Sequence, residues 1–521
     1  MTETDRLDGI RTAVEDMSQG RYGEAEATLT AILDEIPDQP DAYHMLGMLR
    51  FVTGHPDDAV KLISKAISLN GEDAAYHANL ALVRQSLGRQ TEAEDALRKA
   101  VQLAPQSINH HVTLGTFLLK QESYHEAADI FRKTLALDPV CFSAISGLAT
   151  ACEEMGQTEE AEAGYRKALE TEEVPSLHFN LGNVLRDQHR ADEALAAYDR
   201  AIELDPEFAE AHVHKAFTLM LKGDMLPAWE EYEWRWQIPA FASTGREFTA
   251  PVWTGDGLDG RTLLIETEQG FGDTLQFIRY AKLASETGGR IIVECRKAMR
   301  RLLESAAGIN ELALAGEPLP PYDVHVPLLS LPRIFQTSLG TVPAHTPYLF
   351  ASEDDIARWR RQLAHEEAVK IGIVWRGTAE KRGNPTRACP LAHFQPLIDL
   401  PGVKLFSLQK EYGDDDLPLP DGIEDLSPHL ADFADTAAAM RALDLVITID
   451  SAAAHLAGAL GQPTWVLLST GSDWRWLMDR EDSPWYPSIR LFRQTQPREW
   501  TDVLARVADA VEHEFLSESD T

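Results

Sequence analysis

The sequence is poor in cysteine and has no long apolar segment. Its 521 residues include only four cysteines, Cys141, Cys152, Cys295 and Cys389, and no two of them have the CxxC spacing of a zinc site. This scarcity argues against a disulfide framework and against a cysteine-bound metal. No charge-free run of about 18 apolar residues is present, and the first ten residues lack the basic and apolar regions of a signal peptide. We therefore expect a cytoplasmic protein without a membrane span.

Positive charge is also scarce. The chain has 48 lysines and arginines against 83 aspartates and glutamates, a formal net charge of -35. Such a field repels the phosphate backbone of a nucleic acid, so we do not expect nucleic acid as a partner. With 44% hydrophobic and 25% charged residues, the composition is that of a globular protein of two or three domains.

A helical repeat occupies the first two fifths of the chain. Small residues recur at intervals of 34, 34, 34, 33 and 34 residues, at Gly47, Ala81, Gly115, Ala149, Gly182 and Ala216. Alanines keep the same step in a second register, and a larger residue four positions later fills the gap between helices, as Ile63 and Phe131 do. The pattern resembles the tetratricopeptide repeat, with about seven units over residues 1–236. It predicts an α-helical superhelix whose groove docks a protein, or alternatively a spacer or dimerisation arm.

The sequence pattern changes at about residue 237, where the 34-residue period stops. Prolines and glycines mark a linker over residues 237–260, after which short apolar runs alternate with helix-like segments, a pattern typical of parallel sheets covered by helices. We predict one lobe over residues 261–355, a second over 366–500, and a C-terminal helix and tail over 498–521. The predicted strands are Leu263–Ile265, Ile291–Val293, Val369–Val374, Val403–Ser407, Leu445–Ile449 and Thr464–Leu468. A proline-rich passage, residues 316–332, is expected to lead into the link between the lobes.

The segment LDLVITIDSAAAHLAGALGQPTWVLL contains one isolated polar cluster. Asp450 and Ser451 follow a predicted buried strand and precede a predicted helix, a position where free N–H groups favour anions such as phosphate. Ser451 and His455 are four residues apart and share one helix face. Alternatively, Ser451 only caps the helix and His455 is a hydrogen-bonded core histidine. These residues alone favour neither interpretation.

Two further segments are expected near the same sheet edge. WRGTAEKRGNPTR supplies Arg376, Lys381, Arg382 and Arg387, of which we expect one or two to contact a ligand and the rest to be solvated. ETEQGFGDTLQFIRY lacks the third small residue of a dinucleotide fingerprint and the Gly-Lys-Ser/Thr ending of a P-loop. It places Asp273 in the first turn of a helix, where it either serves a ligand or simply caps the helix.

Several motifs together resemble the bacterial tetratricopeptide-repeat glycosyltransferases. They are EQGFGDTLQFIRYAKL, PLLSLPRIF, IGIVWRG, SLQK, DFADTAAAMRALDLVITIDSAAAHLAGALGQPTWVLL, DWRW and SPWYPSIRLFRQ. The resemblance includes flagellin-modifying transferases of nonulosonic acids such as pseudaminic acid, and the heptosyltransferases. It implies a GT-B fold, two Rossmann-like α/β lobes with a nucleotide-sugar donor in the cleft.

The resemblance also assigns roles to residues. It implies that Asp273 is the catalytic base or positions the acceptor. Donor contacts are implied for a larger set: Gly272, Arg376, Gly377, Arg387, Gln409, Lys410, Asp450, Ser451 and His455. No cofactor or metal is expected, because the only Asp-x-Asp string, at 414–416, falls in what we predict to be a solvated acidic turn.

The predicted function is protein O-glycosylation. A sugar passes with inversion from a nucleotide-sugar to a serine or threonine of a protein acceptor, flagellin by resemblance, docked on the repeats. One alternative is a non-catalytic adaptor with a decayed transferase half. Another is a transferase acting on a glycan or lipopolysaccharide.

Overall fold

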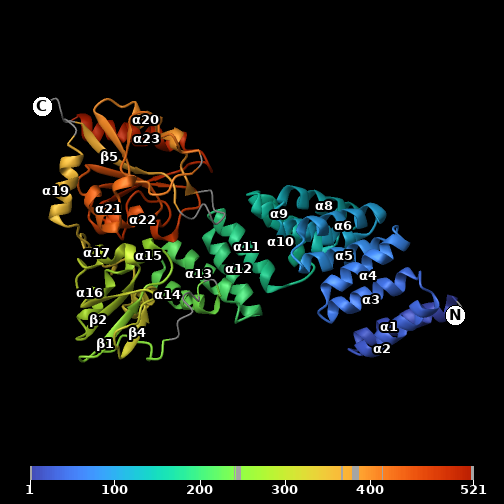
Figure 1. Cartoon of the computed structure of the whole chain (residues 1–521). Coiled ribbons are helices and arrows are strands. Elements are labelled where there is room, and N and C mark those ends of the chain that lie inside the picture. The colour runs from blue at the N-terminus through green and yellow to red at the C-terminus, as the bar shows by residue number, and fades with distance from the viewer. Residues whose placement is uncertain are drawn as a thin grey trace. The chain divides into compact units, whose positions relative to one another are not determined.

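A computed structural model describes residues 3–239, 241, 248–364, 368–377, 387–413 and 415–517 (Figure 1). The chain forms two compact units, Met1–Arg190 and Ala191–Thr521. Among the described helices, none combines the length and the apolar character needed to cross a bilayer.

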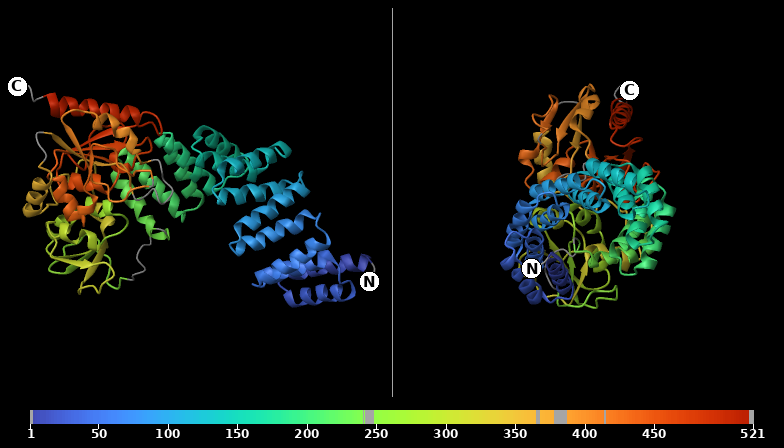
Figure 2. Two further views of the ribbon diagram at one scale, coloured as in Figure 1. Left: turned by 45° about the horizontal axis from the view of Figure 1, so that its top comes forward. Right: turned by 90° about the vertical axis from the view of Figure 1, so that its right-hand side faces the viewer.

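From Glu3 to Arg190, the described residues of the first unit form only α-helices and their connections, and the helices lie in one row (Figure 2). They are α1 (Glu3–Ser18), α2 (Tyr22–Glu35), α3 (Pro40–Val52), α4 (Pro56–Leu69), α5 (Ala74–Ser86), α6 (Gln90–Leu103), α7 (Ile108–Lys120), α8 (Tyr124–Leu137), α9 (Phe142–Glu154), α10 (Thr158–Leu169) and α11 (Pro175–Asp187). The second unit begins with α12 (Ala191–Leu204), α13 (Ala209–Lys222), α14 (Met225–Tyr232) and the 3-10 helix η1 (Glu233–Gln237). These fourteen α-helices confirm the predicted array of about seven helix pairs.

The small residues of the repeat lie where helices touch. A Cβ placed on Gly47 would lie 2.6 Å from Ile63, and one on Gly115 would lie 2.7 Å from Phe131. Both Ile63 and Phe131 are fully buried. The larger residues therefore fill the gaps opposite the glycines, as the period predicts, and close helix packing requires the missing side chains.

Two parallel sheets follow in the second unit. The smaller has the order β3-β2-β1-β4, with β1 (Thr262–Glu266), β2 (Arg290–Cys295), β3 (Glu311–Leu314) and β4 (Val324–Pro327). Its helices include α15 (Phe271–Phe277), α16 (Tyr280–Ser285), α17 (Arg300–Leu303) and α18 (Leu331–Ile334). One core joins α13 and α14 to this sheet, through residues such as Met220, Trp229, Leu263 and Ile265.

The larger sheet has the order β10-β9-β8-β5-β6-β7. Its strands are β5 (Val369–Val374), β6 (Val403–Ser407), β7 (Ile423–Asp425), β8 (Leu445–Ile449), β9 (Thr464–Leu468) and β10 (Ile489–Arg493). Helices α20 (Gln395–Ile398) and α23 (Thr501–Val511) cover one face, with Leu397, Leu504 and Val507 in its core. Helices α21 (Phe433–Met440) and α22 (Ala452–Ala459) contribute to the core on the other face. The α/β architecture predicted for the C-terminal part is thus present.

The strand predictions were incomplete. All six predicted strands are present, but β3, β4, β7 and β10 were missed. The proline-rich passage 316–332, expected only to lead into the inter-lobe link, contains one of the missed strands, β4, which pairs with β1. Proline is tolerated there because β4 is an edge strand of the smaller sheet. Helix α19 (Glu353–Gln362) occupies the predicted link.

Candidate functional site

Each sheet changes direction at one point in its strand order. In the larger sheet the chain passes from β5 outward to β6 and β7, and then returns to β8 on the other side of β5. In the smaller sheet β4 likewise lies on the opposite side of β1 from β2 and β3. Ligands of open α/β sheets bind outside the carboxyl ends of the strands at such points. Gly270–Asp273 follows β1, and Asp450 and Ser451 follow β8, so both predicted segments lie at these positions.

Ser451 is the N-cap of α22. Its Oγ accepts a hydrogen bond from the Ala453 N–H at 3.3 Å and lies 3.2 Å from Thr448 Oγ1. The capping interpretation of Ser451 therefore holds, and it does not exclude a ligand at the same helix end. Asp450 is different, because its carboxylate is engaged by neighbouring side chains: Oδ2 lies 3.1 Å from Nη1 of Arg387, and the Trp476 side chain also interacts with it.

His455 is a buried, neutral imidazole. Its Nδ1 lies 2.9 Å from the Tyr486 hydroxyl, and its ring stacks on Trp476 with 5.4 Å between centroids. Burial lowers the pKa of His455 to about 3, and the charge of Arg475 acts in the same direction. The other ring edge faces Gly272, where a Cβ would lie 2.9 Å from Cδ2 and 3.6 Å from Nε2. The imidazole therefore touches the helix that follows β1 of the other sheet.

Asp273 is held on both sides. Its Oδ2 accepts a hydrogen bond from the Gly270 N–H at 2.8 Å, which caps α15. Its Oδ1 forms an ion pair with Nη2 of Arg475. Asp273 is thus both a cap and a member of a charged cluster.

Negative and positive side chains alternate along that cluster, which runs from the segment after β1 of the smaller sheet to the segment after β8 of the larger sheet. Arg475 Nη1 lies 2.8 Å from Asp473 Oδ1, Arg387 Nη2 lies 3.5 Å from Asp473 Oδ2, and Arg387 Nη1 lies 3.1 Å from Asp450 Oδ2. We call Asp273, Arg475, Asp473, Arg387 and Asp450 the charged relay. Burial raises the pKa of Asp450, an effect that Arg387 opposes. For Asp473, burial also acts upward, but Arg475 and Arg387 outweigh it and leave the pKa below its ordinary value.

The structure brings six predicted site residues together: Gly272, Asp273, Arg387, Asp450, Ser451 and His455. The others contact different partners. The Gln409 amide makes four hydrogen bonds to backbone, from the N–H groups of Trp375 and Arg376 and to the carbonyls of Arg376 and Glu411. Since a side-chain amide has about four hydrogen-bonding sites, Gln409 orders the loop after β5, which contains Gly377.

Two cations near that loop are also engaged. Lys410 donates to the carbonyls of Ser427 and Leu430. Arg376 Nε lies 3.1 Å from Asp416, which also accepts hydrogen bonds from the Trp375 indole and the Gly413 N–H. The expectation of a solvated acidic turn was wrong at Asp416, which is only 4% exposed because it holds these groups. Lys381, Arg382 and Asp414 lie outside the described residues.

The sequence interpretation missed the residues between β9 and β10. Asp473, Arg475, Trp476 and Tyr486 all contribute to the site, and only the motifs DWRW and SPWYPSIRLFRQ, quoted without roles for their residues, pointed to them. In the same segment, Leu477 has φ 54°, a left-handed conformation that is costly for leucine. Arg493 on β10 donates to the carbonyls of Trp476 and Leu477 at 2.6 and 3.0 Å, and so holds this turn. The signal that could have found these residues is their place after the carboxyl end of β9.

The site has no evident metal position. In the described ranges, no group of three histidine, cysteine, aspartate or glutamate side chains is arranged to hold a metal ion. The carboxylates of the charged relay are instead neutralised by arginines.

Sequence comparisons identify the repeats. Models described as tetratricopeptide repeat match residues 16–83, 74–107 and 112–177, and one described as TPR repeat matches residues 182–223. Protein FlbA of Caulobacter vibrioides is 26% identical over 431 residues, which cover 70% of this chain and 72% of FlbA. Because the helical array ends near residue 237 of 521, a match of that extent reaches into the α/β region.

Solved structures also match. YrrB, a TPR protein with an unusual peptide-binding site, is 20% identical over 35% of this chain and 95% of YrrB, with a TM-score of 0.32. PilF of Pseudomonas aeruginosa is 20% identical over 40% of this chain and 94% of PilF, with a TM-score of 0.36. The helix pairs and the four matched repeat models together show that the N-terminal part of the chain is an array of tetratricopeptide repeats.

Proposed function

We propose that the protein is a GT-B glycosyltransferase that moves a sugar from a nucleotide-sugar to a serine or threonine of a protein docked on its repeats. The observation that carries the proposal is the meeting of two sheet switch points. Gly272, after β1, lies against His455 of α22, after β8, and Asp273 is the next residue along the chain. A donor bound at the end of β8 would therefore have its anomeric carbon close to a carboxylate of the other sheet.

The donor phosphate is assigned to the N-terminus of α22. The free N–H groups and dipole of an α-helix favour an anion, and His455 and Arg387 flank this helix end. The neutral His455 imidazole offers Nε2 for a hydrogen bond to phosphate oxygen.

The reaction is a single displacement with inversion. The acceptor hydroxyl oxygen forms a bond to the anomeric carbon while the bond from that carbon to the phosphate oxygen breaks, and the electron pair leaves with the phosphate. Asp273 takes the hydroxyl proton. Its oxygens accept one hydrogen bond each, from Gly270 and Arg475, and a carboxylate oxygen has room for a second. Helix dipole, His455 and Arg387 stabilise the charge that develops on the leaving phosphate.

The acceptor is proposed to be flagellin and the sugar a nonulosonic acid such as pseudaminic acid. Both choices rest on the resemblance to flagellin-modifying transferases and not on the geometry of the site. An array of helix pairs is a surface suited to peptides, which favours a protein over a glycan or lipopolysaccharide acceptor. The proposed compartment is the cytoplasm, where nucleotide-sugars are made.

Nucleotide binding tests the donor half of the proposal. The full chain is titrated with CMP, UDP, GDP and ADP in a calorimeter. We expect one nucleotide to bind, and we expect Asp450→Asn and His455→Ala to weaken its binding at least about tenfold, the effect of losing one buried polar contact. His513→Ala, at an exposed histidine outside the site, is the matched control. Equal binding by all variants, or no binding of any nucleotide at millimolar concentration, contradicts the assignment.

A further inference from the structure

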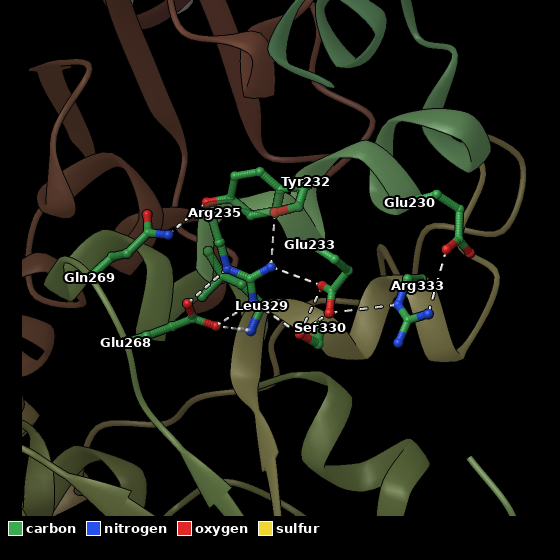
Figure 3. A network of polar contacts seen from close by, with 9 residues as sticks. All are labelled: Glu230, Tyr232, Glu233, Arg235, Glu268, Gln269, Leu329, Ser330 and Arg333. Carbon is green, nitrogen blue, oxygen red and sulfur yellow. Dashed lines mark hydrogen bonds and ion pairs between the residues drawn. The ribbon is translucent and has the colours of Figure 1, made fainter. Parts of the chain in front are cut away.

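Side chains at the end of the repeat array, in α14 and η1, form hydrogen bonds and an ion pair with the loop that leads to Asp273 (Figure 3). Arg235 of η1 is fully buried, and its Nε and Nη2 each lie 3.0 Å from a carboxylate oxygen of Glu268. Two parallel hydrogen bonds of this kind fix the relative orientation of both side chains. Glu268 also accepts a hydrogen bond from the Leu329 N–H at 3.0 Å, so the loops after β1 and β4 share one anchor.

Gln269 is held by a second contact from the repeat side. Its side-chain N–H donates to the Tyr232 hydroxyl at 2.6 Å. Gln269 has φ 58°, a left-handed conformation that a non-glycine residue adopts at a cost and that persists only when its surroundings impose it. Its carbonyl accepts a hydrogen bond from Arg296. Tyr232 and Arg296 thus hold the residue from opposite ends.

The position of this loop passes directly to Asp273. Gly270, the next residue, is the N-cap of α15, and its N–H donates to Asp273 Oδ2 at 2.8 Å. A shift of Gln269 therefore moves the group that fixes the carboxylate.

The hydrogen bond of Tyr232 to Gln269 is made from a position of the repeat whose side chain packs within the array in earlier units. Tyr165 occupies the same position of an earlier repeat. Its hydroxyl donates to Glu153 and lies 3.1 Å from the Thr150 hydroxyl, and both partners belong to the neighbouring helix α9. The Tyr232 hydroxyl instead bonds outside the array, to the loop after β1.

We infer that Tyr232 and Arg235 are positioning residues for Asp273, which makes the last repeat helix part of the catalytic half. The inference rests on the proposed function for the role of Asp273, but the positioning itself concerns only the loop. The Gly270 N–H reports on it, because its protection from exchange depends on the Asp273 carboxylate staying in place.

Hydrogen exchange of the full chain, resolved to the Gly270 amide, tests the inference without any substrate. We expect Tyr232→Phe and Gln269→Gly each to speed exchange of Gly270 about tenfold, the effect of one lost hydrogen bond. Glycine tolerates the left-handed conformation at 269, so this second variant keeps the fold if Tyr232→Phe does not. The double variant should exchange no faster than either single one, because all remove the same bond. Tyr165→Phe is the matched control and should leave Gly270 unchanged.

Unchanged Gly270 exchange in Tyr232→Phe and Gln269→Gly, or fully additive effects in the double variant, overturns the inference. Sugar transfer provides the second readout. We expect Tyr232→Phe to lower kcat and to leave the KM for the nucleotide-sugar unchanged, since donor contacts lie on the other sheet. If wild-type protein transfers no sugar while Gly270 exchange responds as expected, the proposed function fails and the positioning stands.

Discussion

The guanidinium of Arg475 and the carboxylate of Asp273 form an ion pair that joins the two sheets, with 2.5 Å between Nη2 and Oδ1. The two residues are separated by 202 positions in the chain. Arg475 also donates to Gln276 Oε1 at 2.6 Å and to Asp473 at 2.8 Å, so its guanidinium contacts both sheets' segments. The proposed base is therefore positioned by a cation of the opposite sheet.

Replacing Arg475 should destabilise the second unit. Arg475→Gln leaves Asp273 without its ion pair and Asp473 with Arg387 alone, and removing one partner of a buried pair costs about 3 kcal/mol. Urea denaturation measures this loss in the free energy of unfolding. Arg132→Gln removes exposed pairs with Asp129 and Glu160 and should cost less than about 1 kcal/mol. An equal loss in both variants would mean that the buried pair has no special role.

A methyl group at Gly272 should disturb the contact between the sheets. In Gly272→Ala the new Cβ would lie 2.9 Å from Cδ2 of His455, whose ring is fixed by Trp476 and Tyr486. The imidazole or α15 must move, and we expect sugar transfer to fall by about 100-fold, as misplacement of about 1 Å does in enzymes. Gly471→Ala is the control, because nothing lies within 4 Å of its Cβ position. Full activity of Gly272→Ala would show that the close contact between Gly272 and His455 is not needed for sugar transfer.

His455 should remain neutral from pH 8 down to pH 5. Its pKa of about 3 in the folded chain lies below the ordinary value of 6.5, so folding favours the unprotonated ring. The stability contributed by this group is full above pH 6.5 and is lost as the pH falls through 3. The ring proton resonances of His455 should not shift between pH 8 and pH 5, whereas those of the chain unfolded in urea should titrate near 6.5. A midpoint near 6 in the folded protein would contradict the burial argument.

Glu153 should make the first unit less stable at alkaline pH. Burial raises its pKa to about 7 from an ordinary value of 4.5, although the Tyr165 hydroxyl opposes the shift. Because the folded pKa is the higher one, the stabilising contribution is full below pH 4.5 and is lost as the pH rises through 7. Glu153→Gln imitates the protonated side chain. We expect it to raise the Tm at pH 8 by about 2 °C and to have little effect at pH 4.5.

Glu170, at the end of α10, supplies the control for this experiment, because its side chain is exposed and is not among the groups that shift the pKa of Glu153. Glu170→Gln should change the Tm about equally at both pH values. Stabilisation by Glu153→Gln that does not depend on pH would show that the charge of Glu153 is not its cause.

The sequence predicts features that arise from local pattern. The 34-residue period fixes which helices touch, because small and large residues at Gly115 and Phe131 meet wherever the period repeats. The strand Leu445–Ile449 and the cap at Ser451 follow from a buried apolar run and a capping side chain, both readable within a few residues. Short or proline-containing strands such as β4 carry too little pattern, since their pairing to β1 is decided by the sheet.

The charged relay could not be predicted from the sequence, because its members come from segments that are distant in the chain. Whether Asp273 meets a ligand or Arg475 depends on how two sheets pack, which no local window contains. Gln409 shows a second limit: an amide that binds a ligand and one that orders the backbone of Arg376 look identical in sequence. Asp450, Ser451 and His455 could be found because the end of a strand in a parallel sheet is itself a predictor of ligand sites.

Protein glycosylation itself is tested most directly by the intact mass of flagellin. The protein is produced together with flagellin in a host that supplies the nonulosonic-acid pathway, and the flagellin is analysed by mass spectrometry. The account predicts an increase by the mass of one or more sugars, which disappears with Asp273→Ala and His455→Ala while both variants still co-purify flagellin. Flagellin that co-purifies with the wild-type protein but keeps its unmodified mass would contradict the account and favour a docking adaptor.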